Sequence, residues 1–456
     1  MPNSLINKTN IFLTLVIGVL FGFWCLAFLP IVSRNLYFLI SVLLLFVFII
    51  ALLINVNVAL TALFIARASL DPLFNYSKVN ILGENIGMGG VLNFCIIIIA
   101  GLFMIRDPKR IAGNPVNKWW LWFLAVSGVS VIYSPTPGIA LKVFGQLLSY
   151  AAMAVIPFYM IRDINDKRFW IKVLFFSSFL HIVFANIDLF HHGQIYADAG
   201  WRIKGTFSHP NVLAFYLMFM IMLVFYMLKS GLFSLTRTKT NLLILYMLNL
   251  FILFVATKTR SAWIACVVLF STYGVFKERK YLMMSFILPC LLLLMPFTRE
   301  RIATAFATGV GGNNSLLWRI QLWLSTIHNI REGFLFGKGL ASFEYFSINF
   351  NSLTRTVAGS PAHNTYLEVL FETGIIGLVS FVGIFISMLR SFYRKVKGAV
   401  QALSREYAIV FAYVVSYMVL CFSDNMRHYL AFNWYFWFFI GVMLTPITDG
   451  SEGKDG

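Results

Sequence analysis

The sequence predicts an all-α fold: a polytopic membrane helix bundle of about fourteen spans. Of its 456 residues, 59% are hydrophobic and only 12% are charged, a composition far from that of soluble domains. Apolar runs of about 17 to 25 residues recur along the chain, and in a bilayer such runs must be helices because no water satisfies the backbone. The five cysteines all lie in apolar stretches, so they predict no disulfide framework.

The expected spans follow one another with mostly short connections, and residues 1–456 are expected to form a single integral membrane domain. The first apolar run, Ile11 to Val32, is long for a signal-peptide core and is expected to be a retained span. The span at 56–73 is the weakest, because it carries Arg67 and Asp71. The full set is 11–32, 36–54, 56–73, 88–105, 119–133, 139–161, 169–190, 211–228, 241–256, 261–276, 281–297, 365–389, 406–422 and 429–447.

The distribution of basic residues sets the expected orientation. Every second loop between residues 106 and 405 is rich in Lys and Arg, and such loops face the cytosol. Both termini are therefore expected to be cytoplasmic. The net charge of +18 follows from this pattern and from attraction to anionic lipid headgroups, so no nucleic acid is expected as a partner.

Residues 298–363 form a long outer loop between the eleventh and twelfth expected spans. Long loops in compact proteins are usually functional or disordered, and this one is not of low complexity. Its segment from Ser315 to Ile330 is expected to be an amphipathic helix that lies on the outer membrane surface or against the bundle. The apolar positions at helical spacing are Leu316, Ile320, Trp323, Leu324 and Ile327.

Four polar patches fall on the outer side of the membrane in this orientation, so they can meet. They are the segments 201–211, 257–261, 318–323 and 362–368. Each of them holds polar or charged side chains that a bilayer protein keeps only at a cost.

Arginines in these patches are candidate anion ligands. Arg260 lies at the hydrocarbon boundary, where it either snorkels to the interface or clamps an anion, because a guanidinium matches phosphate oxygens. Arg319 is either a second clamp or the polar face of the surface helix. Arg202 and Lys204 either add positive charge to the site or are ordinary loop charges.

His363 is the candidate proton acceptor, because imidazole is the side chain most readily tuned to take a proton near neutral pH. Asn364 can orient the imidazole ring or a substrate hydroxyl. Glu368 and Glu372 lie four residues apart, on one face of the following helix, where carboxylates tend to be functional or paired. A structural pairing of Glu372 with a basic residue of a neighbouring span stays an open alternative.

Two other polar groups are expected to be structural. His209 belongs to a turn, because Pro210 forces the preceding residue out of helix and can start the next span. Asp424 is expected to form an ion pair with Arg427 and His428. No metal is expected, because the chain lacks HxxxH and CxxC spacing.

The chain contains no Walker loop, no GxGxxG before a helix, no GxSxG elbow and no Asp-x-Asp near a long basic loop. No cofactor is therefore expected, and the activated group must come from the substrate itself. A sugar linked to polyprenyl diphosphate fits, because its leaving group needs cations and its acceptor hydroxyl needs a base.

Five motifs occur in order over about residues 200–380. They are Arg202-x-x-Gly205-Thr-Phe-x-x-Pro-Asn211, Thr259-Arg260-Ser261, Arg319-x-x-x-Trp323, Phe336-Gly-x-Gly339 and His363-Asn-x-Tyr-Leu-x-x-x-x-Glu372-x-Gly374-x-x-Gly377. Their order and spacing resemble the O-antigen ligase and O-antigen polymerase superfamily.

This resemblance implies a metal-independent, inverting membrane glycosyltransferase that takes a glycan from undecaprenyl diphosphate on the outer face of the bacterial inner membrane. Carried over by position, Arg260 and Arg319 would hold the diphosphate, and His363 would deprotonate the acceptor hydroxyl or assist the leaving group. The expected substrate-binding residues are Arg202, Lys204, Asn211, Lys258, Asn364, Glu368 and Glu372.

The implied partners are an undecaprenyl-diphosphate-linked glycan, an acceptor glycan or a lipid A-core, the bilayer, and other polysaccharide-assembly membrane proteins. The span number favours a repeat-unit polymerase over a ligase, because the resemblance implies fewer spans for ligases. A glycan flippase or transporter is the third hypothesis. It fits less well, because charged residues at mid-depth are few and no internal repeat is present.

Overall fold

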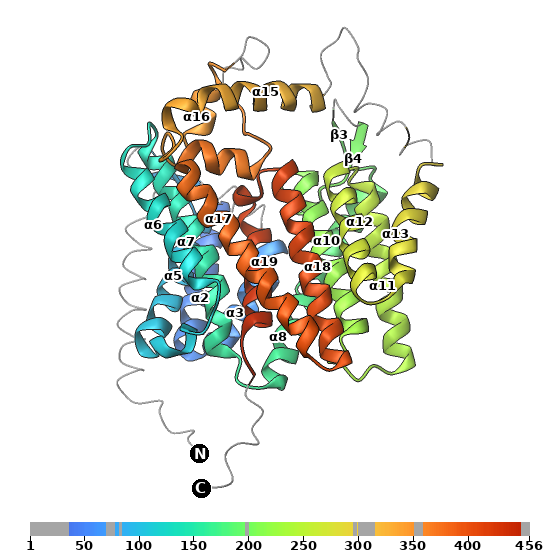
Figure 1. The fold of residues 1–456 in the computed structure, drawn as a ribbon. Helices are drawn as coiled ribbons and strands as arrows, with labels where there is room; N and C mark the ends of the chain where they lie inside the picture. Colours follow the sequence, from blue (N-terminus) through green and yellow to red (C-terminus); the bar gives the residue numbers. More distant parts are fainter. Residues whose placement is uncertain are drawn as a thin grey trace.

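The computed structural model describes residues 36–69, 78–81, 84–196, 200–294, 299, 315–350 and 359–447. Its long helices run side by side as a bundle, and one helix, α15, lies across one end (Figure 1). The helices are α2 (Leu36–Ile54), α3 (Val56–Ser69), α5 (Met88–Arg106), η1 (Pro108–Ile111), α6 (Asn117–Ile132), α7 (Pro137–Met160), α8 (Ile164–Phe176), α9 (Ser178–Phe190), α10 (Pro210–Lys229), α11 (Arg237–Ala256), α12 (Arg260–Phe276), α13 (Arg279–Leu292), α15 (Ser315–Asn329), η2 (Arg331–Gly333), α16 (Phe343–Ser347), α17 (Thr365–Gly398), α18 (Gln401–Ser423), η3 (Met426–His428) and α19 (Leu430–Leu444).

The predicted class, an all-α membrane protein, is confirmed. Within the described ranges, seven helical segments are long and apolar enough to cross a bilayer: Gly89–Arg106, Pro137–Met160, Ile164–Phe190, Pro210–Lys229, Arg237–Ala256, Thr365–Gly398 and Gln401–Ser423. Shorter apolar helices cover Leu43–Ile54, Val56–Arg67, Arg260–Phe276 and Leu430–Leu444. The span expected at 11–32 lies outside the described residues, so the number of about fourteen spans stays a prediction.

Local signals explain where several helices begin. Asp163 caps α8, because its carboxylate accepts hydrogen bonds from the backbone N–H groups of Asn165 and Asp166, both at 2.8 Å. The span expected at 169–190 therefore starts earlier, and it is divided near Ser177 into α8 and α9. At α10, Pro210 is the first helical residue and the His209 side chain accepts from the backbone N–H of Asn211, so the expected turn is confirmed.

Two helices form the centre of the bundle. Nearly every residue of α10 and α19 is buried, which suits helices that are apolar on all sides. Aromatic rings join them, with 5.3 Å between the ring centroids of Tyr216 and Tyr435 and 5.7 Å between those of Phe219 and Phe439. Outer helices instead expose large apolar side chains such as Leu121 and Leu245, as a bilayer environment permits.

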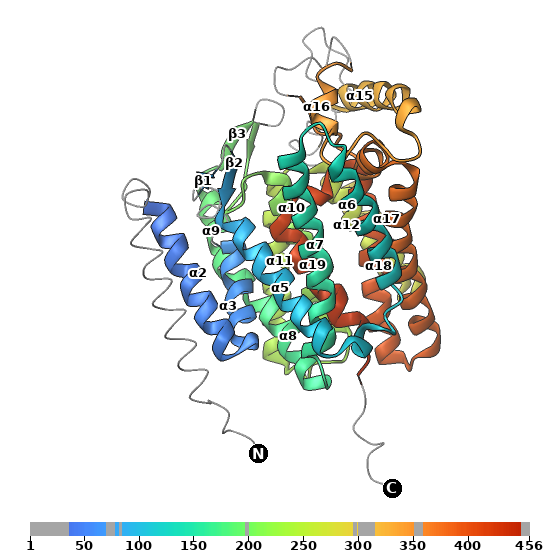
Figure 2. The same cartoon turned by 90° about the vertical axis from the view of Figure 1, so that its left-hand side faces the viewer.

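Two short antiparallel hairpins depart from the all-α expectation. Strand β1 (Lys78–Ile81) pairs with β2 (Glu84–Gly87), and β3 (Gln194–Tyr196) pairs with β4 (Gly200–Arg202). Both hairpins lie toward the end of the bundle that carries α15 (Figure 2). Their strands are too short for sequence periodicity to reveal them.

Helix α15 occupies the segment in which an amphipathic helix was expected. Its buried side consists of Leu322 and Thr326, which face the bundle, with Ile330 following just after the helix. The expected apolar positions Ile320 and Leu324 are instead exposed. The helix packs on the bundle through its other side, against an apolar cluster that includes Ala362 and Phe371. Contact of the expected apolar side with the membrane surface stays a prediction.

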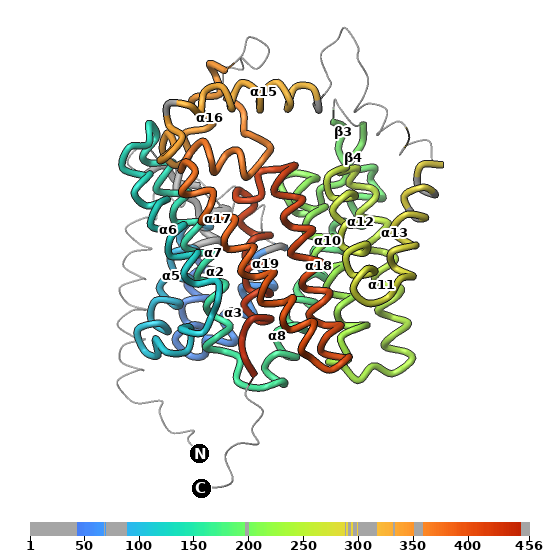
Figure 3. The backbone as a smooth tube through the Cα atoms, in the orientation of Figure 1, coloured from blue at the N-terminus to red at the C-terminus, as the bar shows by residue number. Residues whose placement is uncertain are grey.

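A break at Gly374 divides α17 into two parts. This residue has φ 67° and ψ −173°, and the first turns of α17 lie under α15 before the helix runs down the bundle (Figure 3). The segment 334–339 binds the backbone at the break: Ile375 N–H donates to the Phe334 carbonyl at 2.8 Å, and Lys338 N–H donates to the Phe371 carbonyl at 2.9 Å. A Cβ atom at Gly374 would lie 2.1 Å from the Leu335 carbonyl oxygen.

The substitution Gly374→Ala should therefore destabilise the protein by more than about 1 kcal/mol, because it combines left-handed backbone strain with a backbone clash. Gly101→Ala in α5 is the matched control, since a Cβ there meets nothing within 4 Å and alanine favours helix. Thermal unfolding of the purified protein in detergent measures both. Equal melting temperatures for the two variants would contradict this account of the break.

Candidate functional site

The polar patches predicted from the sequence meet at the end of the bundle under α15 (Figure 1). They come from the turn between β4 and α10, the start of α12, helix α15, the start of α17, and the turn between α18 and η3. The centre of this group is Asp424, a buried carboxylate that directly follows α18.

Asp424 joins several elements at once. Its carboxylate accepts hydrogen bonds from the Asn211 amide of α10 at 2.9 Å and from the Tyr429 hydroxyl at 2.7 Å. His363 Nδ1 lies 3.8 Å away, at ion-pair rather than hydrogen-bond distance. Burial raises the pKa of Asp424, but interaction with His363 and the charge of Arg319 outweigh that effect and lower it to about 2. The carboxylate is therefore ionised at neutral pH.

His363 is held in a strained backbone position between this carboxylate and an aromatic ring. Its φ of 49° lies in the left-handed region, which costs a residue with a Cβ free energy and is typical of functional sites. The Trp318 ring of α15 is 5.8 Å from the His363 ring, centroid to centroid. The side chain is 26% exposed, so the imidazole is oriented by the protein and still reachable from outside.

Arg319 reaches the same turn from α15. One guanidinium nitrogen donates to the Ser423 carbonyl at 2.8 Å, and Ser423 directly precedes Asp424. The Trp323 indole of the same helix donates to the Ala362 carbonyl at 2.8 Å, next to His363. The motif Arg319-x-x-x-Trp323 thus fastens α15 over His363 and leaves Arg319 half-buried at the site.

Arg202 holds the other side of the site together. Its guanidinium donates to the Thr257 carbonyl at 2.7 Å, to the Asn211 side-chain oxygen at 2.9 Å and to the Thr259 hydroxyl at 2.9 Å. The side chain is only 4% exposed. These contacts tie the β3–β4 hairpin to the starts of α10 and α12, which gives Arg202 a structural task.

Arg260 is the first residue of α12 and follows the Thr259 that Arg202 binds. It is half-buried. A cation at a helix N-terminus meets the positive end of the helix dipole, while the free N–H groups of that terminus attract anions. Lys258 just before it has a φ of 52°, and its ammonium lies 4.5 Å from the Trp201 ring centroid.

Asn364 and Lys204, which were also expected to bind substrate, make local contacts within the protein. Asn364 caps α17, since its side chain accepts from the Leu367 N–H at 3.1 Å, and it is buried. Lys204 is half-buried, and its backbone N–H donates to the Asp188 carboxylate at 2.8 Å.

Glu368 and Glu372 form a buried ion cluster with the turn after α18. Arg427 lies 2.7 Å from a Glu372 oxygen and 3.1 Å from a Glu368 oxygen, and His428 Nε2 lies 2.8 Å from Glu368. Glu372 is thus paired with a basic residue, as the structural alternative expected, but this residue lies in the short helix η3 and not in a neighbouring span. The expected pairing of Asp424 with Arg427 and His428 is wrong, because the two glutamates of α17 face those cations instead.

Sequence reasoning missed the position of Asp424 beside His363. The two residues are far apart in the chain, and the nearby Arg427 and His428 offered closer candidate partners. The only available signal was an acidic residue placed on the same outer side as the His and Arg motifs.

Comparison with known proteins gives two matches in sequence. Residues 243–382 match the family described as O-Antigen ligase, a segment that includes Arg260, Arg319 and His363. Both matches support the resemblance to the O-antigen ligase and polymerase superfamily that the motifs predicted. It is also 22% identical over 320 residues to the exopolysaccharide production protein ExoQ of Rhizobium meliloti (strain 1021), covering 62% of this chain and 68% of that protein.

Replacing Arg427 with Met should destabilise the protein by about 3–5 kcal/mol, because removal of one partner leaves buried charges uncompensated. Arg162→Gln is the control, since Arg162 is 71% exposed in its pair with Asp166 and such surface pairs contribute at most about 1 kcal/mol. Thermal unfolding in detergent compares them. A loss no larger than that of the control would refute a stabilising ion cluster.

Proposed function

We propose that this protein is a membrane glycosyltransferase that moves a glycan from undecaprenyl diphosphate to a sugar hydroxyl. The observation that carries the proposal is the meeting of His363 and Arg319 around Asp424, with Asn211 and Arg202 linking this group to the residue before Arg260. A base and cations from distant parts of the chain therefore lie at one end of the bundle, as transfer from a diphosphate requires.

In this proposal Arg260 and Arg319 bind the diphosphate. Both are half-buried, so they combine partial exclusion of water with access to a ligand, and water exclusion strengthens charge interactions. The N-terminus of α12 adds its free N–H groups. Lys258 and Lys204 supply further positive charge near this end of the bundle.

His363 acts as the base. The acceptor hydroxyl oxygen attacks the anomeric carbon, the hydroxyl proton goes to His363 Nε2, and the bond between the anomeric carbon and the phosphate oxygen breaks. Undecaprenyl diphosphate leaves with the electron pair, and its charge is stabilised by the arginines. Attack opposite the leaving group inverts the configuration, and no metal is required.

Asp424 serves as a positioning residue for His363. Its ionised carboxylate faces Nδ1, which favours the tautomer with the proton on Nδ1 and leaves Nε2 free to accept. We assign Arg202, Asn211, Asn364, Glu368 and Glu372 to holding this arrangement rather than to binding substrate, because their polar groups are already engaged by protein partners.

Repeat-unit polymerisation is the favoured form of the reaction, with ligation to a lipid A-core as the second candidate. The name of the Rhizobium relative, an exopolysaccharide production protein, supports polymerisation. The description of the matching family as O-Antigen ligase supports ligation. In either case the proposed site faces the periplasm from the bacterial inner membrane, with both termini in the cytosol, in agreement with the alternating basic loops.

The substitutions His363→Ala and Arg260→Ala should each lower the rate of glycan transfer by about a hundredfold or more, because loss of a base or of charge stabilisation costs that much. His328→Ala is the control for a histidine, since His328 is exposed on α15. Purified protein in vesicles with lipid-linked glycan gives the rates. Undiminished transfer by both variants would remove them from the proposed mechanism.

Deleting the gene should separate the two forms of the reaction by the glycan that accumulates. Without a polymerase, single repeat units are expected on the carrier or final acceptor, because no enzyme joins them. Without a ligase, long chains are expected to remain on undecaprenyl diphosphate. Electrophoresis of the extracted glycans measures this, and undiminished long chains on the normal acceptor would contradict both forms.

A further inference from the structure

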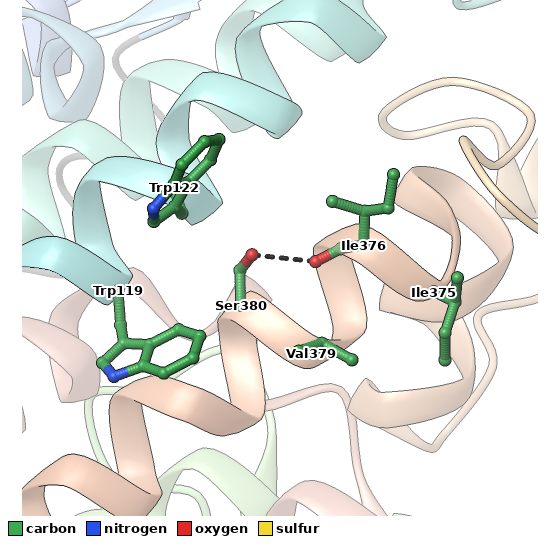
Figure 4. Close-up of a pocket in the computed structure, with 6 residues that line it drawn as sticks. All are labelled: Trp119, Trp122, Ile375, Ile376, Val379 and Ser380. Carbon is green, nitrogen blue, oxygen red and sulfur yellow. Dashed lines mark hydrogen bonds between the residues drawn. The ribbon is translucent and has the colours of Figure 1, made fainter.

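Two apolar hollows lie beside α17, one before and one after its break at Gly374. The first has a volume of about 370 Å³ and is lined by Ile327, Ile330, Arg331, Phe334 and Leu370, so it lies between the end of α15 and the first part of α17. The second has a volume of about 310 Å³. Its walls are Trp119 and Trp122 of α6 and Ile375, Ile376, Val379 and Ser380 of α17 (Figure 4).

The segment around Phe334 joins the two hollows. Phe334 lines the first hollow, and its carbonyl accepts a hydrogen bond from the N–H of Ile375, which lines the second. Leu370 and Ile375 stand on opposite sides of the Gly374 break. Trp122 and Val379 are more than half exposed, so the second hollow opens on the outer surface of the bundle, which is apolar here.

An apolar layer under α15 lies between the first hollow and the candidate site. It consists of the buried residues Leu322, Ile330, Phe343, Ala362 and Phe371, with Trp318 and Leu367 packed against it. Trp318 contacts the His363 ring at one end of α15, and Ile330 lines the hollow just past the other end. At 1.5 Å per residue the two lie about 18 Å apart.

We propose that these hollows hold the isoprenoid tail of the lipid-linked donor, which enters from the bilayer between α15 and α17. This inference rests on the proposed function, which supplies a ligand with a diphosphate head and a long apolar chain. Such a ligand can reach from the site to both hollows at once. An ordinary phospholipid, by contrast, would fill a hollow with no head group in the site.

The charge at the rim of the first hollow suits this ligand. Arg331 is the charged member of its lining and is exposed, where its guanidinium can meet an anionic head that moves in from the membrane surface. The rest of the lining is aliphatic or aromatic, as burial of a hydrocarbon chain requires.

The experiment fills the hollows and varies the carrier lipid. Leu370→Trp and Val379→Trp block the first and second hollow, and transfer is measured with the same glycan on undecaprenyl diphosphate and on farnesyl diphosphate, a carrier too short to reach beyond the first hollow. Each variant should raise KM for the undecaprenyl donor about tenfold, equivalent to about 1.4 kcal/mol. For the farnesyl donor, Val379→Trp should leave KM unchanged.

Leu245→Trp is the control, because Leu245 is exposed on α11, away from both hollows, and it should change neither KM. The proposal is overturned if Val379→Trp raises KM equally for both donors, or if neither filling variant changes KM for the undecaprenyl donor, as expected if the hollows hold bulk lipid. Absence of transfer by the unmodified protein would count against the proposed function instead, so the two failures are distinguishable.

Discussion

The end of the bundle under α15 depends on the contacts made by the buried carboxylate of Asp424. It lies in the turn between α18 and η3 and receives side chains from α10, from Tyr429 at the start of α19, and from the residue two before α17. An unpaired charge in such a place would be costly, so its partners are fixed by the need to compensate it. Through Asn211 and Arg202 the same constraint extends to the start of α12, and it thereby sets where Arg260 and His363 stand.

The break in α17 is the second feature that shapes this end of the bundle. Because the helix turns at Gly374, its first part can lie under α15, and the glycine motif at Phe336-Gly-x-Gly339 can bind the exposed backbone there. A Cβ at Gly337 or Gly339 would lie within 2.5 Å of atoms of Glu372 or Ser134, respectively. The close approach of other backbone atoms is thus a physical reason for the glycines in this motif. The sequence alone suggested no role for them.

Sequence reasoning could predict the all-α membrane class, because apolar length is a local property. It could also group the motifs of His363, Arg319 and Arg202 at one end of the helices, where the hydrogen bonds and the ion pair around Asp424 join them. It could not assign partners, since these are decided by which helix ends meet in space. Asp424 and Arg427 are three residues apart in the chain, yet one faces His363 and the other faces Glu372. The side of α15 that packs on the bundle could not be predicted for the same reason: Phe343 of α16 and Ala362, which precedes α17, supply its apolar contacts.

The three bonds made by Arg202 bear on how mutational scanning of such proteins is interpreted. Arginines whose loss abolishes activity are readily grouped together as ligands of the substrate phosphates. Here the Arg202 guanidinium binds groups of the protein itself, and its removal would release Asn211 and Thr259 from a shared cation. Loss of activity alone therefore does not separate an arginine that holds the protein together from an arginine that binds an anion. Ligand affinity measured apart from turnover does.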